Sequence, residues 1–312
     1  MAQGLLDQAQ VLGGPELRMK HAILGAGAIG GLVGTALASL GEDVTLVVRP
    51  ENLAGYPKSL TLERPQGSIS APAKAVAALT EPVDVLWIAT KTYQLQTALG
   101  AVHSLPTCAV PLLNGVDHVE ILRAHFGRDR VVPAAIAVEA EKIAPGQFLQ
   151  RSPVVRLNLS ASGEPLLGGV VGRLGDLGFT WQFVQNEQTL LWSKLCFLAP
   201  LALVTSASGM NKGEILANAE WKHKLASAIA EACAVARASG AEVDPPKPQA
   251  IFDSMPSGMR SSMQKDLAAG RQLELDAIAG PIVRGGERYG IDVPTTVGLV
   301  AAIRAKIVAH HA

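Results

Sequence analysis

One lysine of this chain stands in surroundings that suit catalysis. Lys194 lies in the run Leu191-Trp-Ser-Lys-Leu-Cys-Phe-Leu198, which is otherwise apolar apart from one serine. Burying an ammonium group is costly unless it is paired or functional. A protonated lysine stabilises the negative charge that grows on a carbonyl oxygen during hydride addition, and then supplies the proton. An unperturbed lysine pKa of about 10.4 keeps such a group charged at neutral pH. The alternative is a lysine that extends from a core helix to solvent.

A glycine pattern near the N-terminus predicts a dinucleotide as the partner of this chemistry. Gly25, Gly27 and Gly30 stand between an apolar run, His21–Leu24, and an expected helix at 32–40. The first glycine permits a tight turn, the second lets the backbone approach a pyrophosphate, and the third lets helix and strand pack closely. The helix N-terminus then offers free N–H groups to the phosphates. An ordinary glycine turn is the alternative. The expected cofactor contacts of this loop are Gly25, Gly27, Ala28, Ile29 and Gly30.

The residue after the second expected strand favours NADP over NAD. An NAD site usually has Asp or Glu there, which accepts a hydrogen bond from the ribose 2′-hydroxyl. Here the strand Val44–Val48 is followed by Arg49. A guanidinium suits the 2′-phosphate of NADP, which a carboxylate would repel. The alternative is a solvated surface arginine.

Two further strand ends carry polar side chains. Lys91 follows the apolar run Val83–Ala89, and Asn114 follows Ala109–Leu113. Ligands of open α/β sheets bind beyond the carboxyl ends of the strands. We expect Lys91 to contact the cofactor or balance the charge of the site, and Asn114, whose amide both donates and accepts, to hold the nicotinamide or the substrate. The alternatives are a solvated loop lysine and a turn residue of an Asn-Gly pair.

The elements that must position these residues divide the chain in two. Apolar runs alternate with helical stretches as far as Val184, which predicts a mostly parallel sheet covered on both faces. A hairpin is expected from 59–63 and 68–73. From Glu187 onward the pattern is helical, with helices expected at 190–207, 221–239, 247–252, 261–269, 274–289 and 295–310. We therefore expect an N-terminal tail at 1–18, a Rossmann-type α/β domain at 19–186 and an all-α domain at 187–312.

Composition narrows the class of protein. Lys and Arg number 27, as do Asp and Glu, so no electrostatic attraction to nucleic acid or to a membrane surface is expected. No long apolar run suggests a membrane span, and no basic start with an apolar block suggests a signal peptide. Cys108, Cys196 and Cys233 are scattered without metal-ligand spacing. Such usage fits a reduced, cytoplasmic protein without a metal site.

With the lysine, the glycine loop and the strand ends in this order, the chain resembles the ketopantoate reductases (2-dehydropantoate 2-reductases). The most specific portion comprises Ser261-Ser-Met-Gln-Lys-Asp266, Arg271-Gln-Leu-Glu-Leu-Asp276 and Tyr289-Gly-Ile-Asp-Val-Pro294. The resemblance implies a Rossmann domain, a helical domain, NADPH as cofactor and reduction of 2-dehydropantoate to pantoate. It implies catalytic roles for Lys194 and Glu274, substrate contacts from Asn114, Lys194 and Ser262, and cofactor contacts from Asn114 and Ala140.

The chain departs from this family on the helix that carries Lys194. The family has asparagines four and eight residues after the lysine, on the same helix face. Here these positions are Leu198 and Ala202, and Lys212 stands where a further asparagine precedes a Gly-Glu pair. Loss of such hydrogen-bond partners shifts selectivity strongly. The sequence therefore predicts either a more apolar 2-keto acid or weak activity on ketopantoate.

The leading hypothesis is NADPH-dependent reduction of a 2-keto acid to a 2-hydroxy acid, with 2-dehydropantoate as the first substrate to test. A second hypothesis is another NAD(P)-dependent dehydrogenase of similar architecture, acting on a β-hydroxy acid or an imine. A third is a non-catalytic sensor that binds NADP. The expected partner is a small keto acid, and a homodimer is one option for assembly.

Overall fold

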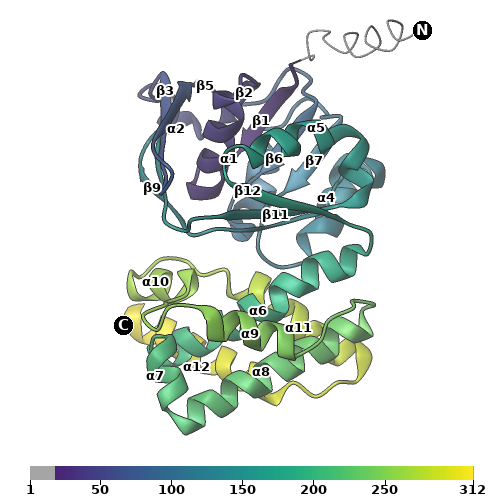
Figure 1. Ribbon diagram of the computed structural model, residues 1–312. Helices are drawn as coiled ribbons and strands as arrows, with labels where there is room; N and C mark the ends of the chain where they lie inside the picture. Colours follow the sequence, from purple (N-terminus) through teal and green to yellow (C-terminus); the bar gives the residue numbers. More distant parts are fainter. Residues whose placement is uncertain (1–17, 312) are drawn as a thin grey trace, which may run out of the picture.

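The N-terminal half of the protein holds the sheets and the C-terminal half holds helices, in a computed structural model that describes residues 18–311 (Figure 1). Of the tail expected at 1–18, residues 1–17 lie outside the described residues. Helix α6 (Glu187–Ser208) begins at the residue where the sequence places the second domain. The division of the chain at 186/187 stays a prediction.

A five-stranded parallel sheet forms the centre of the N-terminal half, in the order β5-β2-β1-β6-β7. Alternate residues of its strands enter different cores, as a pleated strand with both faces buried requires: Ile23 packs on one face, and Ala22 and Leu24 on the other. The expectation of a parallel sheet covered on both faces is therefore confirmed. The strands are β1 (Lys20–Leu24), β2 (Asp43–Val47), β5 (Lys74–Val76), β6 (Val85–Ile88) and β7 (Cys108–Pro111).

Different helices cover the two faces of this sheet. Helix α1 (Ala28–Ser39) packs on one face, and α3 (Leu95–Leu99) and α4 (His118–Phe126) bury their apolar side chains on the other. The short helix α2 (Pro50–Leu53) follows β2. All these connections leave the carboxyl ends of the strands on one edge of the sheet, where the site described below lies.

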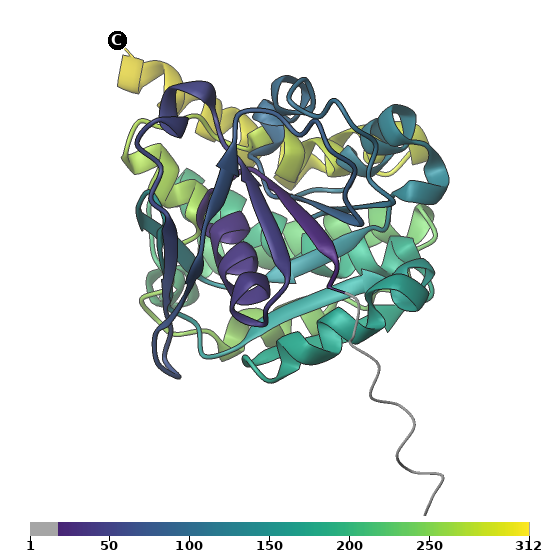
Figure 2. The ribbon, with the colours of Figure 1, turned by 90° about the horizontal axis from the view of Figure 1, so that it is seen from above.

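A second sheet lies on the other side of α1, and Figure 2 shows the helix between the two sheets. The expected hairpin forms its β3 (Ser59–Glu63) and β4 (Ile69–Pro72), and the sequence analysis missed its β9 (Ala140–Ala144) and β10 (Gln147–Gln150). Its order is β4-β3-β10-β9. The ring of Phe148 occupies the space that a side chain at Gly31 would need, so helix and sheet approach closely.

The expectation of one sheet needs a correction here. Strands β8 (Ala134–Ala137), β11 (Val155–Ser160) and β12 (Phe179–Val184) form a third sheet in the order β12-β11-β8, with α5 (Glu164–Gly175) between β11 and β12. A single isolated bridge, Ala109 to Val131, joins it to the parallel sheet. Within this third sheet β11 pairs with β8 antiparallel and with β12 parallel.

The C-terminal half is built around α6, which packs against most of its neighbours and shares one apolar core with them. One helix, α7 (Lys212–Ala217), was not expected; a capping box of Asn211 and Glu214 starts it. By length and composition α6 could cross a membrane, but 78% of its most apolar 18-residue stretch is buried inside the protein. The other helices are α8 (Ala219–Ala238), α9 (Pro246–Ser254), α10 (Ser262–Ala268), α11 (Leu275–Tyr289) and α12 (Pro294–His311).

Candidate active site

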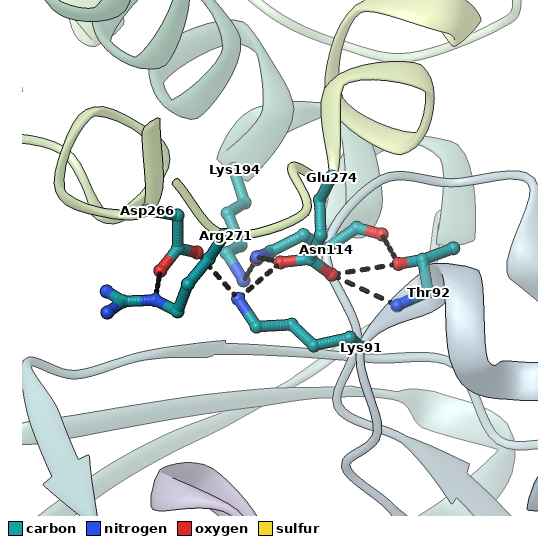
Figure 3. A network of polar contacts seen from close by, with 7 residues as sticks. All are labelled: Lys91, Thr92, Asn114, Lys194, Asp266, Arg271 and Glu274. Carbon is teal, nitrogen blue, oxygen red and sulfur yellow. Dashed lines mark hydrogen bonds and ion pairs between the residues drawn. The ribbon is translucent and has the colours of Figure 1, made fainter. Parts of the chain in front are cut away.

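Lys194 of the helical half meets a strand end of the sheet half. Helix α6 starts at Asn186, whose side chain accepts a hydrogen bond from the Thr189 N–H, and Lys194 lies about two turns further on. The Lys194 Nζ donates to the side-chain oxygen of Asn114, at 2.9 Å (Figure 3). Asn114 stands beyond β7, so the lysine and the amide come from opposite halves of the chain.

Glu274 lies on the far side of the same amide. This carboxylate precedes α11, is 7% exposed, and accepts four hydrogen bonds from the sheet half (Figure 3). The Asn114 amide nitrogen and the Lys91 Nζ donate to its Oε2, at 3.2 and 3.1 Å. The Thr92 N–H and hydroxyl donate to its Oε1, both at 3.1 Å. Asn114 thus connects Lys194 to Glu274 with one group of its amide toward each.

Lys91 is shared between two carboxylates of the helical half. Its Nζ lies 3.1 Å from Glu274 Oε2 and 3.3 Å from Asp266 Oδ2, and the other oxygen of Asp266 accepts from Arg271 Nε at 2.8 Å. Lys91 is thus paired with carboxylates of the helical half, and its expected role in the charge balance of the site stays a prediction.

The two lysines have pKa values shifted in opposite directions. Burial lowers the pKa of Lys194 to about 8, and the nearby Glu274 carboxylate offsets only part of that effect. Partial burial also acts to lower the pKa of Lys91, but the carboxylates of Glu274 and Asp266 outweigh it and the pKa is raised. The expectation of an unperturbed pKa for Lys194 was wrong, because desolvation penalises its charged form.

A histidine behind the site was missed by the sequence analysis. His118 opens α4, is 1% exposed, and has neither ring nitrogen in a well-formed hydrogen bond. Burial, followed by the positive charge of Lys194, lowers its pKa to about 4. The ring is therefore neutral at physiological pH and adds no second cation beside Lys194. In the sequence, His118 follows Asp117 and stands in no recognisable motif, so nothing there predicts that its ring is buried.

The glycine loop has the geometry that dinucleotide binding requires. Gly25 has a φ of +99°, and a Cβ atom there would lie 2.9 Å from the Thr90 backbone nitrogen. A Cβ atom at Gly27 would meet nothing within 4 Å, so the backbone is open to a ligand. A Cβ atom at Gly30 would overlap the carbonyl oxygen of Gly25. Helix α1 begins at Ala28 without a side-chain cap or an acidic residue in its first turn, which suits phosphates.

The remaining expected residues make no hydrogen bond or ion pair with Lys194 or Glu274 among the residues that the structure describes. Arg49 is exposed at the end of β2, with its guanidinium 4.0 Å from the Glu51 carboxylate. Ala140 is the half-buried first residue of β9. Ser262 is exposed in the first turn of α10, while Ser261 takes the N-cap position.

Three positions account for the departure from the expected family. Leu198 is half-buried and Ala202 is 1% exposed, one and two turns beyond Lys194. The buried Lys212 points elsewhere: its Nζ donates to the carbonyls of Asp253 and Met255, at 2.6 and 2.5 Å, where α9 ends. Its charge thus stabilises the carbonyl end of a helix.

Among the described residues 18–311, no group of three His, Cys, Asp or Glu side chains is placed to hold a metal ion. Cys108, Cys196 and Cys233 are all buried and unpaired. The polar residues that the sequence analysis did not assign are Thr92, Asp266 and Arg271. Asp266 and Arg271 stood in the most specific stretch of the sequence, and Thr92 directly follows Lys91.

Two family profiles match nearly the whole of the described chain. The profile described as ketopantoate reductase PanE/ApbA matches residues 21–162, and that of its C-terminal part matches residues 186–307. The chain belongs to the ketopantoate reductase family. The resemblance and the fold class expected from the sequence are confirmed, and the chain is an oxidoreductase with a nicotinamide cofactor.

Known proteins resemble the chain in sequence or in fold. The 2-dehydropantoate 2-reductase of Caulobacter vibrioides is 32% identical over 297 residues, which cover 91% of this chain and 98% of that protein. A D-mandelate dehydrogenase, solved with NADH and anilino(oxo)acetate, has the same fold with a TM-score of 0.83 at 23% identity, over 94% of this chain and all of that one. A dimeric ketopantoate reductase from Staphylococcus aureus also has this fold, with a TM-score of 0.77 at 22% identity, over 93% of this chain and 99% of that one.

Proposed function

We propose that this ketopantoate reductase family member reduces the ketone of a 2-keto acid to a 2-hydroxy acid with NADPH, and that 2-dehydropantoate or a related keto acid is its substrate. The observation that carries the proposal is the amide of Asn114, which accepts from Lys194 and donates to Glu274. Asn114 thereby holds a cationic donor, Lys194, and a carboxylate, Glu274, beside the carboxyl end of β7. The glycine loop that would bind the dinucleotide follows β1 of the same sheet.

Residues of the sheet half would hold the cofactor. The backbone of Gly25, Gly27 and Gly30, with the N–H groups of Ala28 and Ile29, would bind the pyrophosphate. Arg49 would pair with the 2′-phosphate, and Ala140 would line the same site. When bound, NADPH supplies the hydride that the keto carbon accepts.

Lys194 would act as the general acid. A protonated ammonium stabilises the negative charge that develops on the keto oxygen and then donates its proton to form the hydroxyl. A lysine with a pKa of about 8 gives up this proton more readily than an unperturbed one, and is still mostly protonated at neutral pH. The neutral amine regains a proton from solvent before the next turnover.

Glu274 and Asn114 would orient the reactants and not donate the proton. The Glu274 carboxylate is the acceptor in all four of its hydrogen bonds, which suits its ionised form because that form has no proton to donate. Asn114 would fix the direction of the Lys194 ammonium, and Ser262, which is exposed in the first turn of α10, would contact the substrate carboxylate or hydroxyl.

A keto acid with an apolar side chain is the second candidate substrate. The helix face that carries Lys194 continues with Leu198 and Ala202, which have no hydrogen-bonding side chain. The Lys212 ammonium donates hydrogen bonds to carbonyl groups at the end of α9. These residues favour a branched or aromatic 2-keto acid over one with a terminal hydroxyl.

The test is oxidation of NADPH by the purified protein with 2-dehydropantoate and a panel of branched and aromatic 2-keto acids, followed by absorbance at the nicotinamide band. We expect turnover with at least one keto acid, and a higher kcat/KM with NADPH than with NADH. Turnover only with an imine and NADPH, or only with a β-hydroxy acid and NADP⁺, would support the alternative dehydrogenase. NADPH binding without any turnover would support a sensor. A homodimer and a cytoplasmic location are proposed with this function, and light scattering tests the former.

A further inference from the structure

Asp266 lies one contact away from the groups that would meet the substrate. It belongs to α10, its side chain is 16% exposed, and each of its oxygens has a cationic partner (Figure 3). Oδ2 lies 3.3 Å from Lys91 Nζ and Oδ1 lies 2.8 Å from Arg271 Nε. The backbone carbonyl of Asp266 also accepts from the Arg271 N–H at 2.9 Å, which fixes the turn between α10 and α11.

Lys91 transmits this arrangement to Glu274. The same ammonium that contacts Asp266 donates to Glu274 Oε2, the oxygen that also accepts from Asn114. The Lys91 side chain is 41% exposed and flexible, so one carboxylate alone would leave it several rotamers. Two carboxylates on opposite sides restrict it to the position between them.

We propose that Asp266 is a positioning residue, which holds the Lys91 ammonium against Glu274 and through it keeps Glu274 and Asn114 aligned with Lys194. This inference rests on the proposed reductase function for its kinetic consequences. Asp266 touches no reacting atom in this role. Its carboxylate also adds a negative charge to the site, which disfavours a keto acid anion, so its presence has an electrostatic cost for substrate binding.

The kinetic test compares Asp266→Asn with Lys265→Met. Lys265 is the neighbouring residue of α10 and makes an ion pair of its own to the sheet half, with Glu139 at 3.0 Å, outside the contacts of Glu274. We expect Asp266→Asn to lower kcat about tenfold while the KM for the keto acid stays constant or falls. Lys265→Met should change both constants less than about twofold. Equal effects of the two variants, or a raised KM with unchanged kcat for Asp266→Asn, would overturn the proposal.

A second measurement is independent of turnover. The Tm shifts of Asp266→Asn and Glu274→Gln should not add in the double variant, because both residues act on Lys91. In a Lys91→Met background the two shifts should add. Additive shifts already in the presence of Lys91 would overturn the positioning role, whatever the substrate. If no keto acid is reduced but this coupling is found, the proposed function fails and the positioning role stands.

Discussion

The two sides of the candidate site differ in the density of their polar contacts. On the side of the strand ends, the Glu274 carboxylate accepts hydrogen bonds from Lys91, Asn114 and Thr92. On the side of α6, Lys194 is followed by Leu198 and Ala202, whose side chains offer none. The first side would serve the reacting carbonyl and the second the rest of the substrate.

Under the proposed function, this difference would assign chemistry and substrate recognition to separate residues. Four donors on one carboxylate leave little freedom to change any member of the set without unpairing another. An apolar helix face can change one side chain at a time, with the cost confined to packing. Evolution of a new substrate would therefore act on α6 before it acted on Glu274.

The largest effect is expected from Lys194→Ala. Loss of the general acid should lower kcat by about 10²- to 10⁴-fold, because the alkoxide would form without a proton donor. NADPH affinity, measured by fluorescence titration, should stay within about twofold, since the lysine belongs to the substrate side. Unchanged turnover would remove Lys194 from the mechanism.

The pH profile gives the next largest effect. Lys194 must be protonated for reduction, so kcat/KM should be constant below a pH of about 8 and fall about tenfold per unit above it. In Glu274→Gln the falling limb should move to lower pH, because the carboxylate raises the pKa of Lys194. A limb that stays in place in this variant would separate Glu274 from the titration of Lys194.

The smallest effect tests the apolar side. Leu198→Asn places an amide one turn beyond Lys194 and should raise the kcat/KM ratio of 2-dehydropantoate over a branched keto acid by about tenfold. Leu198→Met is the matched control, since it keeps the site apolar and should leave the ratio unchanged. An identical ratio in both variants would show that this helix face does not contact the substrate.

Much of the fold could be predicted from the sequence because its signals are local. Four of the five parallel strands, the hairpin and the helices of the C-terminal half other than α7 follow from apolar runs and periodicity, and the helix from Glu187 onward was placed within a few residues. Strand β5 was not expected. Strands β9 and β10 could not be found in this way. They are short, β9 is largely exposed and charged, and β10 pairs with β3 from more than 80 residues away. Pairing over such a distance has no local signature.

The candidate site divides along the same line. The types of Lys194 and Glu274, and the strand-end positions of Lys91 and Asn114, are visible in the sequence. Their mutual contacts depend on how the helical half is set against the sheet. For that reason three features could not be predicted from the sequence. They are the ion pair between Asp266 and Lys91, the lowered pKa of Lys194, and the hydrogen bond from Lys212 to the end of α9.

The position of Phe148 against Gly31 has a consequence for the order in which the protein assembles during synthesis. Helix α1 leaves the ribosome early, and β3 and β4 follow soon afterwards to pack against it. The part of its outer face at Gly31 is covered only when Phe148 of β10, more than a hundred residues later, has been made. A nascent chain that stops before residue 147 leaves this part of the helix, just behind the glycine loop, without its cover. The cofactor site, although encoded first, is thus completed only after about half of the chain has been translated.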